Sequence, residues 1–241
     1  MSTSTQADSA YNDIRRHILT LELAPGERLK EEEWANRLSV SRSAIRESLT
    51  RLRGEGLVEQ APKRGFFVRG MTESDVHQIK ELREILETAA LLLACQRATP
   101  KQLAQLEELC DDFANFAKKG YVTGAFEADL RFHNVLMEAS GNPRLHEFYM
   151  RSNIIIFNIR QGRARGYIDD HELTEKDHRA IVDALRRKDQ KRGVKILKEH
   201  FERGERNVLE SNSASSNNNE AQPSELVAPH PELLSVAQPP K

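Results

Sequence analysis

Four side chains in the second half of the sequence have the types and the spacing of a divalent-metal site. Asp129 and His133 are four residues apart, so a helix places both on one face, where they can share an ion. His178 and His200 lie among the apolar residues of two further helical patterns. Imidazole with one carboxylate suits Zn, Ni or a similar divalent ion and leaves coordination positions open.

The alternative is that each of these residues is a buried polar group with its own hydrogen-bond partner. One inward histidine usually has that role, but three histidines and an aspartate are harder to satisfy separately. The spacing leaves both interpretations open. Four other histidines lack an apolar setting and are expected at the surface, namely His17, His77, His146 and His171.

The segments that carry these residues are all predicted to be helices. From Met71 to about Leu209, apolar residues recur at helical spacing, and the first helix is expected to bury a face that includes Ile85. Helix starts are indicated at Thr72, Pro100, Pro143, Thr174 and about Lys188, with Thr174 and Asp177 forming a capping-box-like start, and Gly120 and Gly124 mark the entry to a further helix. The helix from Pro143 is expected to reach about Ile159. These patterns predict an all-helical bundle of six or seven helices.

A second set of reactive side chains lies between Val40 and Val58. Apolar residues recur at helical spacing from Val40 to Leu52, and the opposite face carries Ser41, Arg42, Ser43, Arg46, Arg51 and Arg53. The start of such a helix offers backbone N–H groups to a phosphate, and arginine can bond guanine at two positions. A solvated amphipathic helix is the alternative, and only the neighbouring segments argue against it.

Those neighbouring segments have the order of a winged helix-turn-helix. Helices are predicted at Asp8–Leu23 and Glu31–Leu38, followed by a tight link in which Ser41 is the N-cap. Two strand-like segments then enclose a basic turn, Lys63-Arg64-Gly65. Its basic side chains can reach DNA phosphates or the minor groove. Seven basic and three acidic residues lie between Arg42 and Arg69. This segment is therefore locally basic although the whole chain has a net charge of −1.

Length and composition set the wider frame. A chain of 241 residues that is 38% hydrophobic and 30% charged is expected to hold two modest domains, at residues 8–70 and 71–210. Cys95 and Cys110 are expected to be small core residues. The polar start and the lack of a long apolar run predict a cytoplasmic protein with no membrane segment. Residues 211–241, with five of the nine prolines and no aromatic residue, are predicted to be a disordered tail.

The run PGERLKEEEWANRLSVSRSAIRESLTRLRGEGLVEQAPKRGFFV resembles the winged-helix domain of GntR-type bacterial regulators. Such domains usually have glycine where this sequence has Ser39. Some carry a basic residue that contacts DNA where this sequence has Glu32. The resemblance implies a mainly α protein that binds double-stranded DNA. The residues that it assigns to DNA contact are Ser41, Arg42, Ser43, Arg46, Lys63, Arg64 and Gly65.

The segments ELREILE, ADLRFHNVLMEASGNPRL, DHRAIVDAL and LKEHFERGERN resemble the FCD ligand-binding domain of the FadR branch of these regulators. In that domain a divalent metal is held by residues that match Asp129, His133, His178 and His200. Arg83 matches a position that often binds the carboxylate of an organic-acid effector. The resemblance therefore strengthens the metal interpretation and adds a candidate effector residue.

Two functions follow from these observations. The first is a ligand-responsive transcription regulator that reads an inverted-repeat operator as a homodimer and senses a small carboxylate through a metal-containing domain. The second is a metal-dependent enzyme acting on a small carboxylate, with an attached nucleic-acid-binding module, because a bound metal can activate water. The sequence offers no general base beside the four ligands and no nucleophile motif, so the regulator is the prediction.

Overall fold

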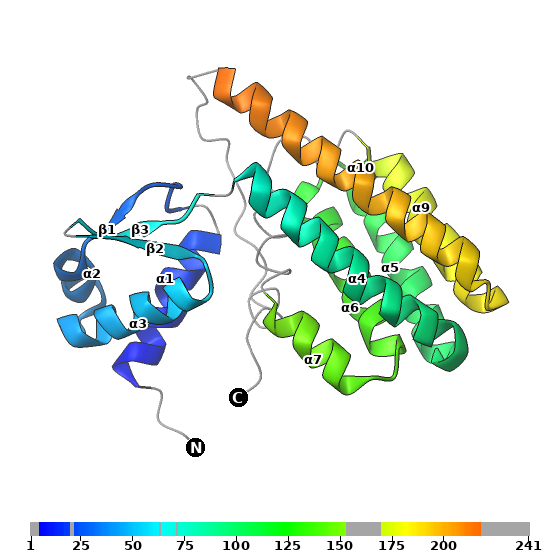
Figure 1. Ribbon diagram of the computed structural model, residues 1–241, viewed down its shortest axis with the longest axis horizontal. Coiled ribbons are helices and arrows are strands. Elements are labelled where there is room, and N and C mark those ends of the chain that lie inside the picture. The colour runs from blue at the N-terminus through cyan, green and yellow to red at the C-terminus, as the bar shows by residue number, and fades with distance from the viewer. Residues whose placement is uncertain (1–4, 20–21, 63, 71, 153–169, 218–241) are drawn as a thin grey trace. The chain divides into compact units, whose positions relative to one another are not determined.

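The computed structural model describes residues 5–19, 22–62, 64–70, 72–152 and 170–217. The chain divides into two compact units, Met1–Thr72 and Glu73–Lys241. Figure 1 shows a small unit of helices and short strands, and a larger unit built from helices. The prediction of a mainly α protein with a winged helix-turn-helix and a helical bundle is confirmed.

The N-terminal unit combines three helices with a small sheet. The helices are α1 (Gln6–Leu19), α2 (Glu31–Leu38) and α3 (Arg42–Gly54). The strands are β1 (Arg28–Leu29), β2 (Val58–Ala61) and β3 (Gly65–Val68). The sheet is antiparallel in the order β1-β3-β2, and β2 and β3 form the predicted wing.

Helix α3 is fixed at its start and along its buried side. The predicted cap is present, since the Ala44 amide donates to the Ser41 hydroxyl over 3.2 Å. Ile45 and Leu49 are fully buried, and the Ser48 hydroxyl donates to the Ala7 carbonyl of α1 over 2.7 Å. These contacts attach the inner face of α3 to α1 and leave its basic face exposed.

The turn between α2 and α3 contains an unfavourable residue. Ser39 has φ +54° and ψ +42°, the left-handed conformation, and its amide caps α2 by donating to carbonyls of the last turn. A side chain in this conformation costs about 1–2 kcal/mol, which glycine avoids. We therefore expect Ser39→Gly to stabilise the N-terminal unit by about 0.5–1 kcal/mol.

Thermal unfolding of the N-terminal unit can be followed by the fluorescence of Trp34, the one tryptophan of the chain, because Trp34 is buried in α2. Ser41→Ala is the control of opposite sign, since loss of an N-cap costs about 1 kcal/mol. A lower melting temperature in Ser39→Gly contradicts the prediction.

Two predictions about the N-terminal unit are wrong. Helix α1 ends at Leu19 rather than near Leu23, and the next described residues, Glu22 and Leu23, are not helical. His17 is buried, at 4% exposure, instead of lying at the surface. Its ring stands edge-on to Trp34 at 5.4 Å, and its Nε2 lies 2.6 Å from Arg37 Nη2. A neighbouring helix therefore supplies the setting that the sequence around His17 lacks.

The C-terminal unit contains six helices among the described residues. They are α4 (Glu73–Arg97), α5 (Pro100–Lys118), α6 (Val122–Ala139), α7 (Pro143–Arg151), α9 (His171–Arg187) and α10 (Gln190–Asn217). Helix α10 lies against α4 (Figure 1). Gly193 permits this close approach, because a Cβ there would lie 2.9 Å from Leu91 Cδ2.

The core of this unit draws on α4, α5, α6, α9 and α10 around Leu91, Phe132 and Phe201. Cys95 and Cys110 are buried free thiols within it, as predicted. None of the helices described is both long and apolar enough to span a membrane.

Several boundaries in the C-terminal unit differ from the prediction. Helix α9 begins at His171, so Thr174 and Asp177 are interior residues rather than a cap, and Asp177 pairs with Arg203 instead. Helix α10 continues to Asn217, past the expected start of the tail, and residues 218–241 lie outside the described residues. Residues 153–159, expected to extend α7, also lie outside them.

The predicted burial of one residue of α4 is wrong, because Ile85 is 67% exposed.

Candidate metal centre and nucleic-acid interface

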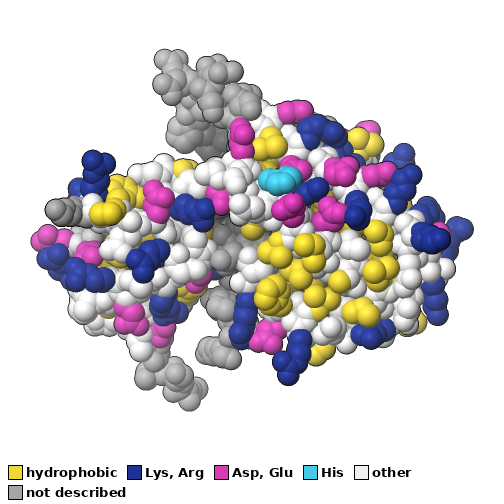
Figure 2. Space-filling view, in the orientation of Figure 1, with side chains coloured by type: hydrophobic (Ala, Val, Ile, Leu, Met, Phe, Trp, Pro, Cys, Tyr) yellow, Lys and Arg dark blue, Asp and Glu magenta, His cyan; other side chains and the backbone are white. Residues whose placement is uncertain are grey.

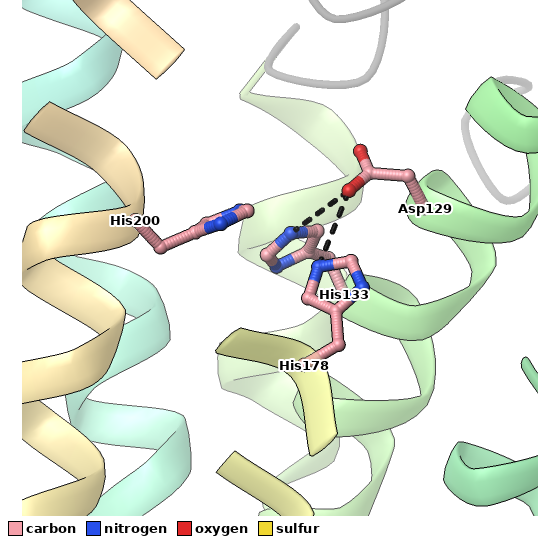
Figure 3. Close-up of side chains that lie close together, drawn as sticks. All are labelled: Asp129, His133, His178 and His200. Atoms are coloured by element: carbon pink, nitrogen blue, oxygen red, sulfur yellow. Dashed lines mark ion pairs between the residues drawn. The ribbon is translucent and has the colours of Figure 1, made fainter. Parts of the chain in front are cut away.

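The four predicted metal ligands come together inside the C-terminal unit. Asp129 and His133 extend from α6, His178 from α9 and His200 from α10, and all four are buried. One potential ligand atom from each residue lies within 4.8 Å of the others. Figure 3 shows the carboxylate and the three rings facing a common point.

The donor atoms of this cluster lack the partners that buried polar groups need. Nε2 of His133 and both ring nitrogens of His178 are buried, with no hydrogen bond to the protein among the described residues. Asp129 Oδ1 lies 3.3 Å from His178 Nε2 and 3.7 Å from His133 Nε2, in ion-pair contacts (Figure 3). A shared cation would take one nitrogen from each ring and so reduce the cost of leaving these buried polar groups unpaired. The residues present therefore fit a divalent metal.

A buried carboxylate, Glu87 of α4, fixes the orientation of His133. Glu87 Oε2 lies 2.5 Å from His133 Nδ1, and both side chains are fully buried. A carboxylate only accepts hydrogen bonds, so Nδ1 carries the proton in the neutral ring, which leaves the Nε2 lone pair for an ion in the cluster. Glu87 is not apparent as a site residue from the sequence, and it also accepts hydrogen bonds from Tyr149 Oη at 3.1 Å and from Arg83 Nε at 3.0 Å.

The other two imidazoles are held differently. The His178 ring stacks on Phe132, with centroids 4.0 Å apart and planes 13° apart. Asp177 Oδ2 lies 3.6 Å from His200 Nδ1, and Asp177 also accepts a hydrogen bond from Arg203. A carboxylate facing the outer nitrogen of a histidine ligand is typical of metal centres, and Asp177 has this place beside His200.

The electrostatic setting keeps two imidazoles neutral and the carboxylate ionised. Burial lowers the pKa of His178, and it lowers the pKa of His200 to about 4. Burial acts to raise the pKa of Asp129, but contacts with His133 and His178 bring it well below its usual value. For His133, burial acts to lower the pKa, and the neighbouring Glu87 carboxylate outweighs burial and raises it. Neutral imidazoles and an ionised carboxylate are the forms that bind metal, so His178, His200 and Asp129 are already in these forms, whereas a protonated His133 would release its Nε2 proton when an ion binds.

Arg83, the predicted effector residue, borders this cluster without belonging to it. Its guanidinium carbon lies 4.4 Å from the centroid of Phe201, whose ring is 5.8 Å from His133 and 5.5 Å from His200. Burial acts to lower the pKa of Arg83, but the Glu87 carboxylate more than offsets it, so Arg83 remains a cation. Glu87 thus connects Arg83 directly to a candidate metal ligand.

In the N-terminal unit, the predicted DNA-contacting residues of α3 share one exposed end. Ser41, Arg42, Ser43 and Arg46 are all exposed, and the hydroxyls of Ser41 and Ser43 lie 2.9 Å apart. Arg46 forms an ion pair with Glu31 of α2, a partner that the sequence analysis did not identify.

The wing presents two of its three predicted contact residues. Arg64 is exposed and donates its amide to the Ala61 carbonyl at 3.1 Å, which closes the turn. Gly65 has φ +95°, a conformation that favours glycine, and it pairs with Ala61 in the sheet. Lys63 lies outside the described residues.

Comparison with known proteins gives two family matches that together cover most of the chain. Residues 6–68 match the gntR family of bacterial regulatory proteins, and residues 78–203 match the FCD domain. The uncharacterised HTH-type transcriptional regulator YdhC of Bacillus subtilis is 28% identical over 194 residues, which are 79% of this chain and 85% of that protein.

Two solved structures have the same fold. A protein of Rhodococcus sp. RHA1 named as a putative transcriptional regulator GntR matches with a TM-score of 0.69 at 25% identity, over 85% of this chain and 97% of that one. McbR of Escherichia coli matches with a TM-score of 0.66 at 24% identity, over 86% and 99%. The relatives are transcription regulators, in agreement with the predicted regulator rather than the enzyme. The chain therefore belongs to the gntR family of bacterial transcription regulators and carries an FCD domain.

Proposed function

We propose that this regulator senses a small organic acid through a divalent metal and answers by changing its affinity for an operator. The observation that carries the proposal is the buried cluster of three histidines and one aspartate, with donor atoms within 4.8 Å of one another. Zn or Ni suits this donor set. Asp129, His133, His178 and His200 would hold the ion, which would supply open coordination positions for a carboxylate oxygen.

Arg83 is the proposed anchor for the effector. Arginine binds a carboxylate through two parallel hydrogen bonds, and Arg83 is a partly buried cation next to the cluster. An acid that reaches both the ion and Arg83 would act on α4, α6, α9 and α10 together. Helix α4 is the first helix after the wing, so a shift in it can reach the DNA-binding unit.

On DNA, the proposed reading residues are Ser41, Arg42, Ser43 and Arg46 of α3, with Lys63, Arg64 and Gly65 of the wing. Arginines at the start of α3 suit base edges in the major groove, whereas the basic turn suits phosphates. One such helix covers only a few base pairs, so we propose a homodimer on an inverted repeat.

A surface on α4 is consistent with a dimer. Ile85 and Leu92 are 67% and 37% exposed and lie seven residues apart, on one face of the helix. Figure 2 shows hydrophobic side chains gathered over α4 on the visible face of the C-terminal unit. Sedimentation velocity at micromolar protein tests the proposal, and a monomer would oppose it.

The experiment that tests effector sensing is a thermal-shift screen of organic acids, sugar acids and amino acids with metal-loaded and with chelated protein. We expect the active acid to stabilise only the metal-loaded form and to change operator affinity about 5- to 150-fold, corresponding to a coupling of 1–3 kcal/mol. Arg83→Ala should keep operator binding and a bound metal, the metal at lower affinity because Glu87 loses one partner, but should lose this response. An unchanged response in Arg83→Ala would show that the effector binds elsewhere.

A further inference from the structure

One arginine of α3 is held by a carboxylate from the preceding helix. Arg46 Nε donates to Glu31 Oε1 over 3.0 Å, and Arg46 Nη2 donates to Glu31 Oε2 over 2.7 Å. The Arg46 side chain is 66% exposed, whereas that of Glu31 is only 17% exposed. Glu31 therefore forms a partly buried support beneath an arginine that extends into solvent.

We propose that Glu31 is a positioning residue, which orients Arg46 to bond a guanine of the operator in two places. The inference rests on the proposed role of Arg46 in reading DNA. A planar guanidinium has five N–H donors in a fixed arrangement, and Glu31 accepts from the pair on the Nε side. The end-on pair, one N–H on each of Nη1 and Nη2, points away from that side and matches O6 and N7 of guanine.

Neither folding stability nor attraction to DNA accounts for the contact between Glu31 and Arg46. An acid in the first turn of α2 stabilises that helix without needing a contact with α3, and an acid beside a DNA-reading helix opposes the phosphate charge. A role in orienting Arg46 explains both the position of Glu31 and the geometry of the contact. A long side chain that is already held in one conformation loses less conformational entropy when it binds DNA.

The same helix end supplies a matched control. Glu33 is also in the first turn of α2, but its carboxylate bonds Lys30 Nζ at 2.6 Å and is 65% exposed. Glu31→Gln and Glu33→Gln remove the same charge from the same turn. General electrostatic effects on DNA binding should therefore be alike in the two variants, and only Glu31→Gln changes the support of Arg46.

The test selects preferred duplexes from random sequence with the full wild-type chain, and then measures affinity for the selected duplex and for its single-base variants. Arg46→Ala should weaken the preference for guanine at one half-site position about 5- to 150-fold. Glu31→Gln should weaken the preference at that same position about 3- to 10-fold, whereas Glu33→Gln should leave it unchanged. In an Arg46→Ala background, Glu31→Gln should have no effect on base preference. Trp34 fluorescence verifies that each variant is folded.

Each other result is decisive. The positioning role is overturned if Glu31→Gln keeps the wild-type preference for guanine while Arg46→Ala loses it. Arg46 would then remain a reading residue. A sharper preference in Glu31→Gln also overturns it, because Glu31 would then be masking Arg46. If Arg46→Ala keeps full preference, the proposed reading role of Arg46 fails, and the inference fails with it.

Discussion

The His178→Ala variant is expected to lose the stabilisation that a divalent metal gives to the wild-type protein. His178 contributes a fully buried ring whose nitrogens form no hydrogen bond with the described residues and whose Nε2 lies 3.3 Å from Asp129 Oδ1, so its loss removes one of four candidate ligands. An ion present at a thousand times its dissociation constant stabilises a native protein by about 4 kcal/mol. We expect that gain in wild-type protein and almost none of it in His178→Ala.

Calorimetry of both proteins, with metal and with chelator, separates the metal effect from lost packing. The difference in stability between wild type and His178→Ala with chelator gives the cost of removing a ring stacked on Phe132. With metal present, the difference also includes the lost stabilisation by the ion. His146→Ala is the matched control, because His146 bonds Asn134 at 2.8 Å and is not part of the cluster. An equal metal-induced gain in His178→Ala and wild type would exclude His178 as a ligand.

Substitution of Glu87 should have the second large effect. Glu87 is fully buried between Arg83 and His133, and removal of one partner from a buried ionic group costs about 3–5 kcal/mol. Glu87→Ala should therefore destabilise the C-terminal unit by about this amount. The milder Glu87→Gln keeps the volume and an acceptor, and should weaken metal binding about 10- to 100-fold, as expected for the outer partner of a histidine ligand.

Tyr149→Phe is the control for Glu87→Gln. It removes one hydrogen bond to the same carboxylate and leaves the contacts with Arg83 and His133 in place. Its expected cost is about 1 kcal/mol of stability, with little change in metal affinity. Metal affinity in Glu87→Gln within twofold of wild type would mean that Glu87 does not position His133.

The ligand cluster was predictable because helical periodicity places residues on a face without knowledge of tertiary structure. Asp129 and His133 share a helix face, and the apolar neighbours of His178 and His200 indicate burial. Glu87 was missed for the opposite reason. Arg83 and Glu87 have the four-residue spacing of an ordinary surface ion pair, and only the packing of α4 against other helices makes them buried.

Other misses also arose from contacts between helices. His17 is buried by Trp34 and Arg37 of α2, and Glu31 meets Arg46 across fifteen residues of sequence. Thr174 and Asp177 have the pattern of a helix start, but Asp177 bonds Arg203 of α10 within an already formed helix. Local pattern therefore predicted the elements and the inward ligands, whereas partners from other elements required the structure.

The most direct test of the metal centre is the metal content of full-length protein purified without an affinity tag. Elemental analysis after equilibration with micromolar Zn, Ni or Mn should give about one divalent ion per chain. The same analysis of His178→Ala should give a much lower content. Wild-type protein that retains none of these metals would contradict the proposal that Asp129, His133, His178 and His200 form a metal site.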